Sequence, residues 1–381
     1  MLPFLRGVCM RNVLKTVLMI EKSNKKNIAA CIIIAVFVFG LISFITTEEK
    51  GNLIKERTGD YQSVSSALYK FQIEDASENG DGSDLYKNLV RQQRVISTQR
   101  MAARVDRPAL YLETSLELAD LRDAAFKMDG FQDVALYLPT KTENQLQRVY
   151  YQELVNEGKS VSQNPLSFYQ FLGYLFGIIG AGWFIFVSIY SCGILIEEFQ
   201  HTSLIKGYPI SFGKYVLAKC SSAMLMVGIF ILLLFICSLP LIYFNGLGDS
   251  SYPVAVYSGS IEVFTTIKFI GVSVLYMLLI ALFAILLSII LNMLLKNMYL
   301  TMFVQLLLYI SPYLFPGMMA FVPWNPINYL NFSRIFNGET LDLATPAALY
   351  MSQGLITIGV CIVIMLFIIK AFFTAGKLKR V

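Results

Sequence analysis

The chain has 381 residues, of which 56% are hydrophobic and only 15% are charged. Soluble domains typically carry about 25% charged and about 45–50% apolar residues, so this composition excludes an ordinary soluble protein and indicates an integral membrane protein. The formal net charge is +5 at pH 7. In a membrane protein, an excess of basic residues indicates which side of the membrane the loops occupy, and is not a sign of nucleic-acid binding. We therefore expect the lipid bilayer, and no nucleic acid, as a partner.

The chain opens with a basic tail, residues 1–27, followed by a first transmembrane helix at residues 28–46. Apolar residues of the tail recur at helical spacing, which predicts an amphipathic helix at the cytoplasmic membrane interface; a flexible basic tail is the alternative. A cleaved signal peptide is disfavoured because no small-x-small cleavage site follows Ile45. The apolar residues on one face of the tail are Leu5, Cys9, Val13, Val17 and Ile20.

Residues 47–165 have the composition of a soluble domain, with clustered charges and a glycine-rich break near Gly80. Four stretches have helical spacing and good helix formers, with Pro108 placed as a first-turn residue and Gly130 as a stop. We therefore predict an extracytoplasmic helical domain between the first and second spans. Its predicted helices are Leu53 to Ile73, Leu85 to Arg104, Pro108 to Met128 and Asn144 to Asn156.

Residues 166–373 contain further apolar blocks, each long enough to cross a hydrocarbon core of about 30 Å at about 1.5 Å per residue. With the first span they predict six transmembrane helices, and the expected fold is an all-α polytopic membrane protein. A cytoplasmic loop at residues 197–219 and a cytoplasmic tail at residues 374–381 complete the prediction. The later spans are Leu166 to Ile196, Ser221 to Phe244, Val263 to Leu295, Met298 to Val322 and Ala347 to Phe373.

The distribution of lysine and arginine predicts which side of the membrane each connection occupies. Basic residues near span ends are retained in the cytoplasm. The two tails, the 197–219 loop, Lys296 and Lys370 together hold fourteen basic residues against three acidic ones, Glu21, Glu197 and Glu198. The opposite side carries more acidic than basic residues, so we expect both termini to be cytoplasmic.

Motifs for catalysis are absent from the sequence. It contains no phosphate-binding loop, no Gly-x-Ser-x-Gly and no His-Glu-x-x-His, and its single histidine is His201. We therefore expect no catalytic residues, no metal site and no cofactor, and do not expect an enzyme. The spans also lack Asp and Glu, which disfavours a proton- or sodium-coupled carrier. The energy source is expected outside this chain.

The segment that connects the second and third spans is the most informative part of the sequence. A pair of acids ends the second span, and a short amphipathic stretch, a Pro-x-Ser turn and two lysines follow. This pattern resembles the cytoplasmic loop of ABC-2 type transporter permeases, the membrane subunits of bacterial ABC exporters. The matching residues are Glu197, Glu198, Phe199, Thr202, Pro209, Ser211, Lys214 and Lys219.

The resemblance implies that Glu197 to Tyr208 forms a coupling helix seated in a cleft of a separate ABC ATPase subunit. In that arrangement Phe199 and Leu204 are apolar contacts and the acids are polar ones. The sequence departs from the family where Gly-Thr usually follows the acids, because His201-Thr202 stands there. The alternative is an ordinary cytoplasmic loop in which Pro209 merely ends a helix.

Small residues on the second span suggest a packing face. Gly173, Gly177 and Ala181 recur every four residues, so a neighbouring helix could approach closely there, either within the chain or in a second permease copy. Polar residues in the later spans face a translocation path or form hydrogen bonds between helices, and the sequence leaves both open. These are Ser288, Asn292 and Gln305.

Together these features predict a permease subunit in a bacterial cell membrane, acting as a dimer with a second copy or a related permease. Because the spans are aliphatic and aromatic with almost no charge, we expect an amphipathic or hydrophobic cargo, with peptides as the first candidate. The competing hypothesis is a non-transporting sensor or scaffold whose extracytoplasmic domain binds a ligand.

Overall fold

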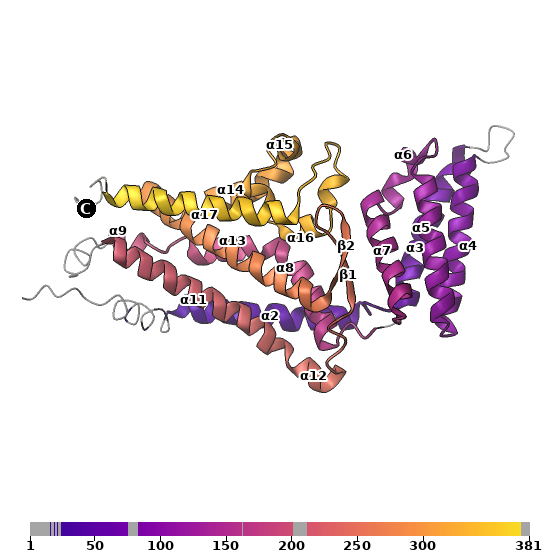
Figure 1. Ribbon diagram of the computed structural model, residues 1–381, viewed down its shortest axis with the longest axis horizontal. Helices are drawn as coiled ribbons and strands as arrows, with labels where there is room; N and C mark the ends of the chain where they lie inside the picture. Colours follow the sequence, from indigo (N-terminus) through magenta and orange to yellow (C-terminus); the bar gives the residue numbers. More distant parts are fainter. Residues whose placement is uncertain are drawn as a thin grey trace, which may run out of the picture.

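The computed structural model describes residues 16, 19, 21, 24–74, 83–161, 163–200 and 212–374. It is mostly helical and has two parts, a block of long apolar helices and a separate helical bundle (Figure 1). The apolar helices form the membrane block. The bundle lies beyond one end of this block.

Five helices of the membrane block are long and apolar enough to cross a membrane. Each is a run of apolar residues in which the helix satisfies every interior backbone group, as lipid requires. The chain is therefore a multi-pass membrane protein. The helices are α2 (Lys25–Thr47), α8 (Phe168–Ser191), α11 (Phe212–Ser238), α13 (Thr266–Leu295) and α17 (Met351–Thr374).

The predicted fifth span is divided in the structure. Helix α14 (Met298–Leu314) has 17 residues, or about 25 Å at about 1.5 Å per residue, less than a hydrocarbon core of about 30 Å. Pro312 lies inside α14, and Pro316 begins the short helix α15 (Pro316–Phe321). Proline removes a backbone donor and disfavours helix at the preceding residue, which explains the break. The count of six spans stays a prediction.

Successive membrane helices alternate in direction (Figure 1). At one end lie α9 (Ile196–Gln200), the beginnings of α2 and α11 and the end of α17. We call this the α9 end, and the opposite end, which faces the helical bundle, the bundle end. Short elements at the bundle end connect the longer helices: α12 (Pro240–Asn245), η3 (Pro326–Tyr329), α16 (Phe332–Phe336) and η4 (Glu339–Leu341).

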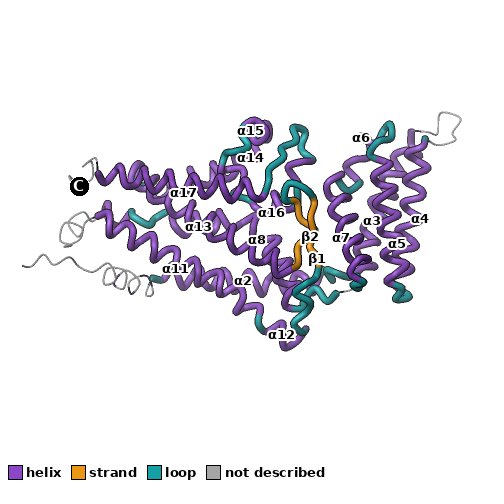
Figure 2. The backbone as a smooth tube through the Cα atoms, in the orientation of Figure 1, coloured by secondary structure: helices purple, strands orange, loops and turns teal. Residues whose placement is uncertain are grey.

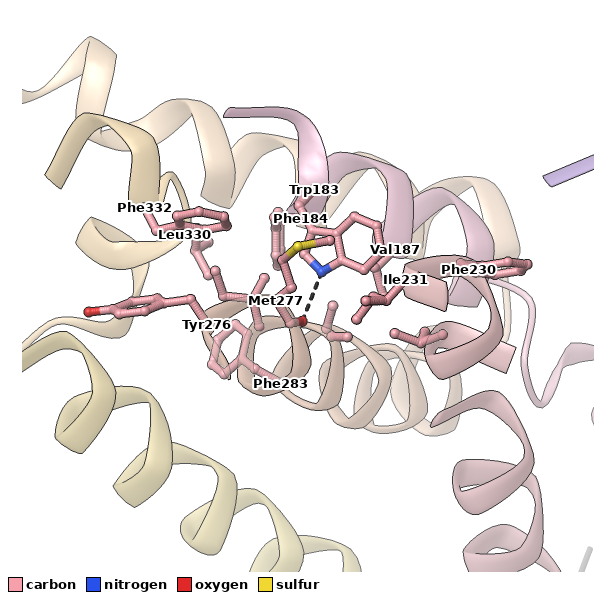
Figure 3. Packing of buried hydrophobic residues seen from close by; sticks show 14 of the residues in the cluster. Trp183, Phe184, Val187, Phe230, Ile231, Tyr276, Met277, Phe283, Leu330 and Phe332 are labelled. Carbon is pink, nitrogen blue, oxygen red and sulfur yellow. Dashed lines mark hydrogen bonds between the residues drawn. The ribbon is translucent and has the colours of Figure 1, made fainter. Parts of the chain in front are cut away.

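The membrane block is held together mainly by the packing of α8 against α13. Trp183 of α8 is buried, and its indole N–H donates to the Met277 carbonyl at 2.8 Å (Figure 3). Phe184 and Tyr276 are fully buried in the same cluster. Lipid is as apolar as these side chains, so close van der Waals packing and satisfied polar groups stabilise this contact.

The helical bundle has its own apolar core. Val64, Leu89, Ile96 and Leu118 are almost completely buried there. The helices begin and end close to the predicted ranges, because capping residues fix them; Thr140, for example, forms a capping box with Glu143. They are α3 (Leu53–Glu74), α4 (Asp84–Arg104), α5 (Pro108–Ala125), α6 (Phe131–Val134), η2 (Ala135–Tyr137) and α7 (Lys141–Glu157).

A β-hairpin lies between the bundle and the membrane block (Figure 2). The all-α fold predicted from the sequence did not include this hairpin. Strand β1 (Pro253–Tyr257) pairs antiparallel with β2 (Ile261–Thr265). The strands are rich in β-branched and aromatic residues, and Gly259, at φ 130°, allows the tight turn. The fold is therefore mainly helical with one hairpin.

Polar contacts join the bundle to the membrane block. The Thr142 hydroxyl donates to Asp342 at 2.9 Å, and the hydroxyls of Tyr150 and Tyr252 lie 2.9 Å apart. Lys159 lies 3.2 Å from Asp249. These bonds reach from α7 and its C-terminal turn to loops that connect membrane helices.

Candidate functional site

Helix α9 holds a buried carboxylate. Glu198 is only 7% exposed, and its Oε1 accepts a hydrogen bond of 2.6 Å from the Tyr215 hydroxyl. The same oxygen lies 3.3 Å from Nζ of Lys219. A buried carboxylate is costly unless it is paired and hydrogen-bonded, and Glu198 has both kinds of partner.

Lys219 also binds a second acid. Its Nζ lies 3.7 Å from Oε1 of Glu21, whose Oε2 accepts a 3.0 Å hydrogen bond from the Asn27 amide. Both Lys219 and Glu21 are largely buried, so solvent ions screen this pair less than a surface pair. We name Glu21, Glu198, Tyr215 and Lys219 the charge cluster. It joins α9 and α11 to the residues that precede α2.

The local structure explains how α11 reaches α9. Tyr215 and Lys219 are one helical turn apart in α11, so their side chains lie on the same face. Lys219 belongs to the loop pattern described above, whereas sequence reasoning missed Tyr215 and Glu21 as members of the site. The spacing of Tyr215 and Lys219 could have indicated that the two side chains share one helix face. Nothing in the sequence indicated that Glu21 lies near them.

A cavity of about 480 Å³ lies beside the charge cluster. Lysines from three different elements line it: Lys26 of α2, Lys219 of α11, and Lys296, which follows α13. Nζ of Lys26 lies 5.0 Å from the centre of the Tyr190 ring, and Nζ of Lys296 lies 5.8 Å from that of Phe199. The α9 end therefore has a hollow between the ends of the membrane helices, lined by these three lysines and by Glu21.

The predicted coupling residues fall into two groups. Glu198 and Phe199 lie in α9, where Phe199 is partly buried against the apolar core, and the backbone of Glu197 continues the same helix. With so little exposed surface, Glu198 is an internal anchor of α9 and offers a partner little area. The remaining predicted residues lie outside the described residues: His201, Thr202, Leu204 and Pro209.

The small residues of α8 are only partly covered. A Cβ at Gly173 would lie 3.5 Å from Thr266, whereas one at Gly177 would meet nothing within 4 Å. Ala181 is exposed and lines an apolar groove of about 410 Å³ together with Phe37 of α2. The face is therefore open to lipid or to another chain.

Among the described glycines of α8, Gly180 leaves the least room for a side chain, and sequence analysis did not single it out. A Cβ there would lie 2.7 Å from the Phe332 ring and would also collide with the Ser333 hydroxyl. That hydroxyl donates to the Gly177 carbonyl. Gly180 thus allows α16 to pack directly on α8.

The polar residues of the later spans form bonds between helices. Ser288 is 2.7 Å from Ser191, and Nε2 of Gln305 donates to Ser288 at 2.8 Å. The Thr301 hydroxyl donates to Asn292 at 2.9 Å. These bonds connect α8, α13 and α14 inside the membrane block. Of the two roles that the sequence left open for these residues, the structure shows hydrogen bonds between helices.

Within the described residues, no group of three or more His, Cys, Asp or Glu side chains could hold a metal ion. No protein-family model, curated protein or solved structure matches the chain. The geometry of the α9 end and the loop pattern are thus the basis for a functional proposal.

Proposed function

We propose that the chain is the permease subunit of an ATP-driven exporter of the ABC-2 type in a bacterial cell membrane. In this proposal the α9 end faces the cytoplasm, both termini are cytoplasmic, and a separate ATPase subunit binds α9 and the residues that follow it. A second copy or a related permease completes the translocation path. The charge cluster is the observation that carries the proposal.

The charge cluster connects α9 to the membrane helices, so a movement of α9 would be transmitted to them. Glu198 in α9 is bonded to two side chains of α11, and through Lys219 to Glu21, which precedes α2. A turn at residues 192–195 joins α9 directly to α8. A partner that displaces α9 therefore acts on three membrane helices together, because separating these groups would leave a buried charge without its partner.

The composition of the membrane block supports an amphipathic or hydrophobic cargo. The groove between α2 and α8 is lined by apolar side chains such as Ile33, Phe37 and Ile178. Such a surface accommodates aliphatic or aromatic groups and offers a small ion no ligands. Hydrophobic peptides remain the expected class.

Co-purification with an ATPase tests the proposal. We expect the tagged chain, solubilised in mild detergent, to recover a protein with a phosphate-binding loop, and we expect Phe199→Ala to reduce that recovery. Lys25→Gln is the matched control, because Lys25 is an exposed residue at the same end. Failure of the wild-type chain to recover any ATPase would contradict the proposal.

A sensor or scaffold is the second candidate, and the contacts between the bundle and the membrane block favour it. The bonds of Thr142, Tyr150 and Lys159 could transmit a change in the bundle to the membrane helices. The same purification separates the two candidates. A sensor recovers no ATPase, whereas a permease loses its ATPase when residues 197–209 are deleted.

A further inference from the structure

Two arginines are buried inside the helical bundle. Arg57 of α3 is 5% exposed and Arg122 of α5 is 3% exposed. Arginine is almost never this buried unless an acidic group neutralises it. We therefore ask which groups neutralise the charges of these two side chains.

The two guanidinium groups share one carboxylate oxygen. Oδ2 of Asp60 lies 2.7 Å from Nη1 of Arg57 and 3.3 Å from Nη2 of Arg122. The other hydrogen bonds go to neutral groups, from Arg57 to the Tyr151 hydroxyl at 3.2 Å and from Arg122 to Gln147 at 3.1 Å. Two buried cations thus share one bonded carboxylate, because Glu56, whose charge also favours the Arg57 cation, is an exposed residue. An excess of positive charge is left away from water.

Both arginines also keep a donor unused. The Nε atoms of Arg57 and Arg122 are buried and have no hydrogen-bond acceptor among the described residues. Burial lowers the pKa of Arg122; Asp60 opposes this effect and the Arg57 charge adds to it. The pKa of Arg57 is instead raised despite its burial, through Tyr151 and Asp60. A second anion beside Arg122 would offset the positive charge that Asp60 leaves unbalanced.

A cavity of about 230 Å³ opens beside Arg122. Its polar wall is formed by Asp60, Ser63 and Arg122, and Val64 begins its apolar wall. The rest is the turn from Leu136 to Pro139, in which Leu136 is 91% exposed. One end of the cavity is therefore polar, with one guanidinium group and one carboxylate, and the other is apolar.

We propose that this cavity binds a small carboxylate ligand with an adjoining apolar group, such as the C-terminus of a peptide. The guanidinium fork of Arg122 matches a carboxylate in shape and charge. The apolar group of the ligand lies against Val64 and the exposed Leu136. This inference does not depend on the transport proposal, since it concerns only the bundle.

Binding of N-acetyl-leucine and of its neutral amide to the full chain in lipid nanodiscs tests the inference, with calorimetry as the measurement. We expect the acid to bind at least about tenfold more tightly than the amide, the equivalent of losing one charge-assisted hydrogen bond. Equal binding of the two probes, or no binding of the acid, would overturn the proposal. Binding of inorganic phosphate but not of the acid would overturn the ligand class.

Two variants connect the binding to this cavity. Leu136→Glu adds a negative charge at an exposed position beside the cavity, so the chain should fold normally and bind the acid at least about tenfold more weakly. Arg148→Gln is the control, because Arg148 pairs with Asp120 and Asp123 outside the cavity. An unchanged affinity in Leu136→Glu, or an equal loss in Arg148→Gln, would overturn the assignment.

Discussion

The Tyr215 hydroxyl donates a 2.6 Å hydrogen bond to the buried carboxylate of Glu198. This bond fixes α9 to the first turn of α11, and the nearby ammonium group of Lys219 neutralises the carboxylate. The position at which the chain leaves α9 is therefore set by side chains of the next membrane helix. If a partner protein binds next to α9, as proposed, its movement would be passed to α11 through this bond.

Removing the Tyr215 hydroxyl should loosen α9. We expect Tyr215→Phe to lower the free energy of unfolding by about 2 kcal/mol, because a hydrogen bond to a buried charged group is lost. Thermal unfolding in detergent measures this change. The control is Tyr299→Phe, since Tyr299 is 72% exposed. Equal stability of the two variants would show that the bond contributes nothing.

Gly180 should tolerate no side chain. Gly180→Ala places a methyl group against Phe332 and Ser333, and we expect a loss of about 1–3 kcal/mol from overpacking. Gly182→Ala is the matched control two residues away, because a Cβ there meets nothing within 4 Å. If both variants unfold at the wild-type temperature, α16 does not pack on α8 as described.

A substitution on the open face around Gly177 tests whether α8 contacts a second copy of the chain. A Cβ at Gly177 would meet nothing within 4 Å among the described residues, so we expect Gly177→Leu to fold normally and to reduce the dimeric fraction in liposomes. Single-molecule photobleaching counts the copies. A dimeric fraction equal to that of the wild type would exclude this face from the dimer contact.

The contact between Lys159 and Asp249 should weaken in acid. Burial raises the pKa of Asp249, but hydrogen bonds from Ser251 and Lys159 outweigh this effect and hold the pKa below its usual 3.8. A depressed carboxylate pKa contributes stability above the unfolded pKa, and this contribution is lost as the pH falls through the folded value.

The unfolding temperature of the wild type should therefore exceed that of Asp249→Asn at neutral pH. The difference should shrink as the pH falls below about 3.8. Asp120→Asn serves as the control, because the Asp120 side chain is 62% exposed in its pair with Arg148 and should show a smaller difference. A difference for Asp249→Asn that is independent of pH would contradict the prediction.

The membrane helices could be predicted from the sequence because long uncharged runs have few alternatives to helix in lipid. Their ends were harder to predict. The predicted span ending at Ile196 stops at Ser191 in the structure, and a turn then sets α9 apart. Apolar composition continues through that turn, so hydropathy alone does not show where the helix ends.

Features that depend on distant partners were not predictable in the same way. The β-hairpin consists of strands of five residues each, which are too short to show a clear period and gain stability by pairing and by packing against α7. Glu21 and Lys219 lie far apart in the sequence, and only the fold brings them together. The loop pattern singled out Glu198, but not that its carboxylate is buried.

The most direct test of the central claim is photo-crosslinking in living cells with a reactive amino acid at Leu204. The account predicts a crosslink to a separate ATPase that carries a phosphate-binding loop. The same reactive amino acid at Leu136, which is exposed in the bundle, should not capture that ATPase. The account would be contradicted if Leu204 captured no ATPase, or if a membrane-impermeant reagent outside the cell labelled a cysteine at that position.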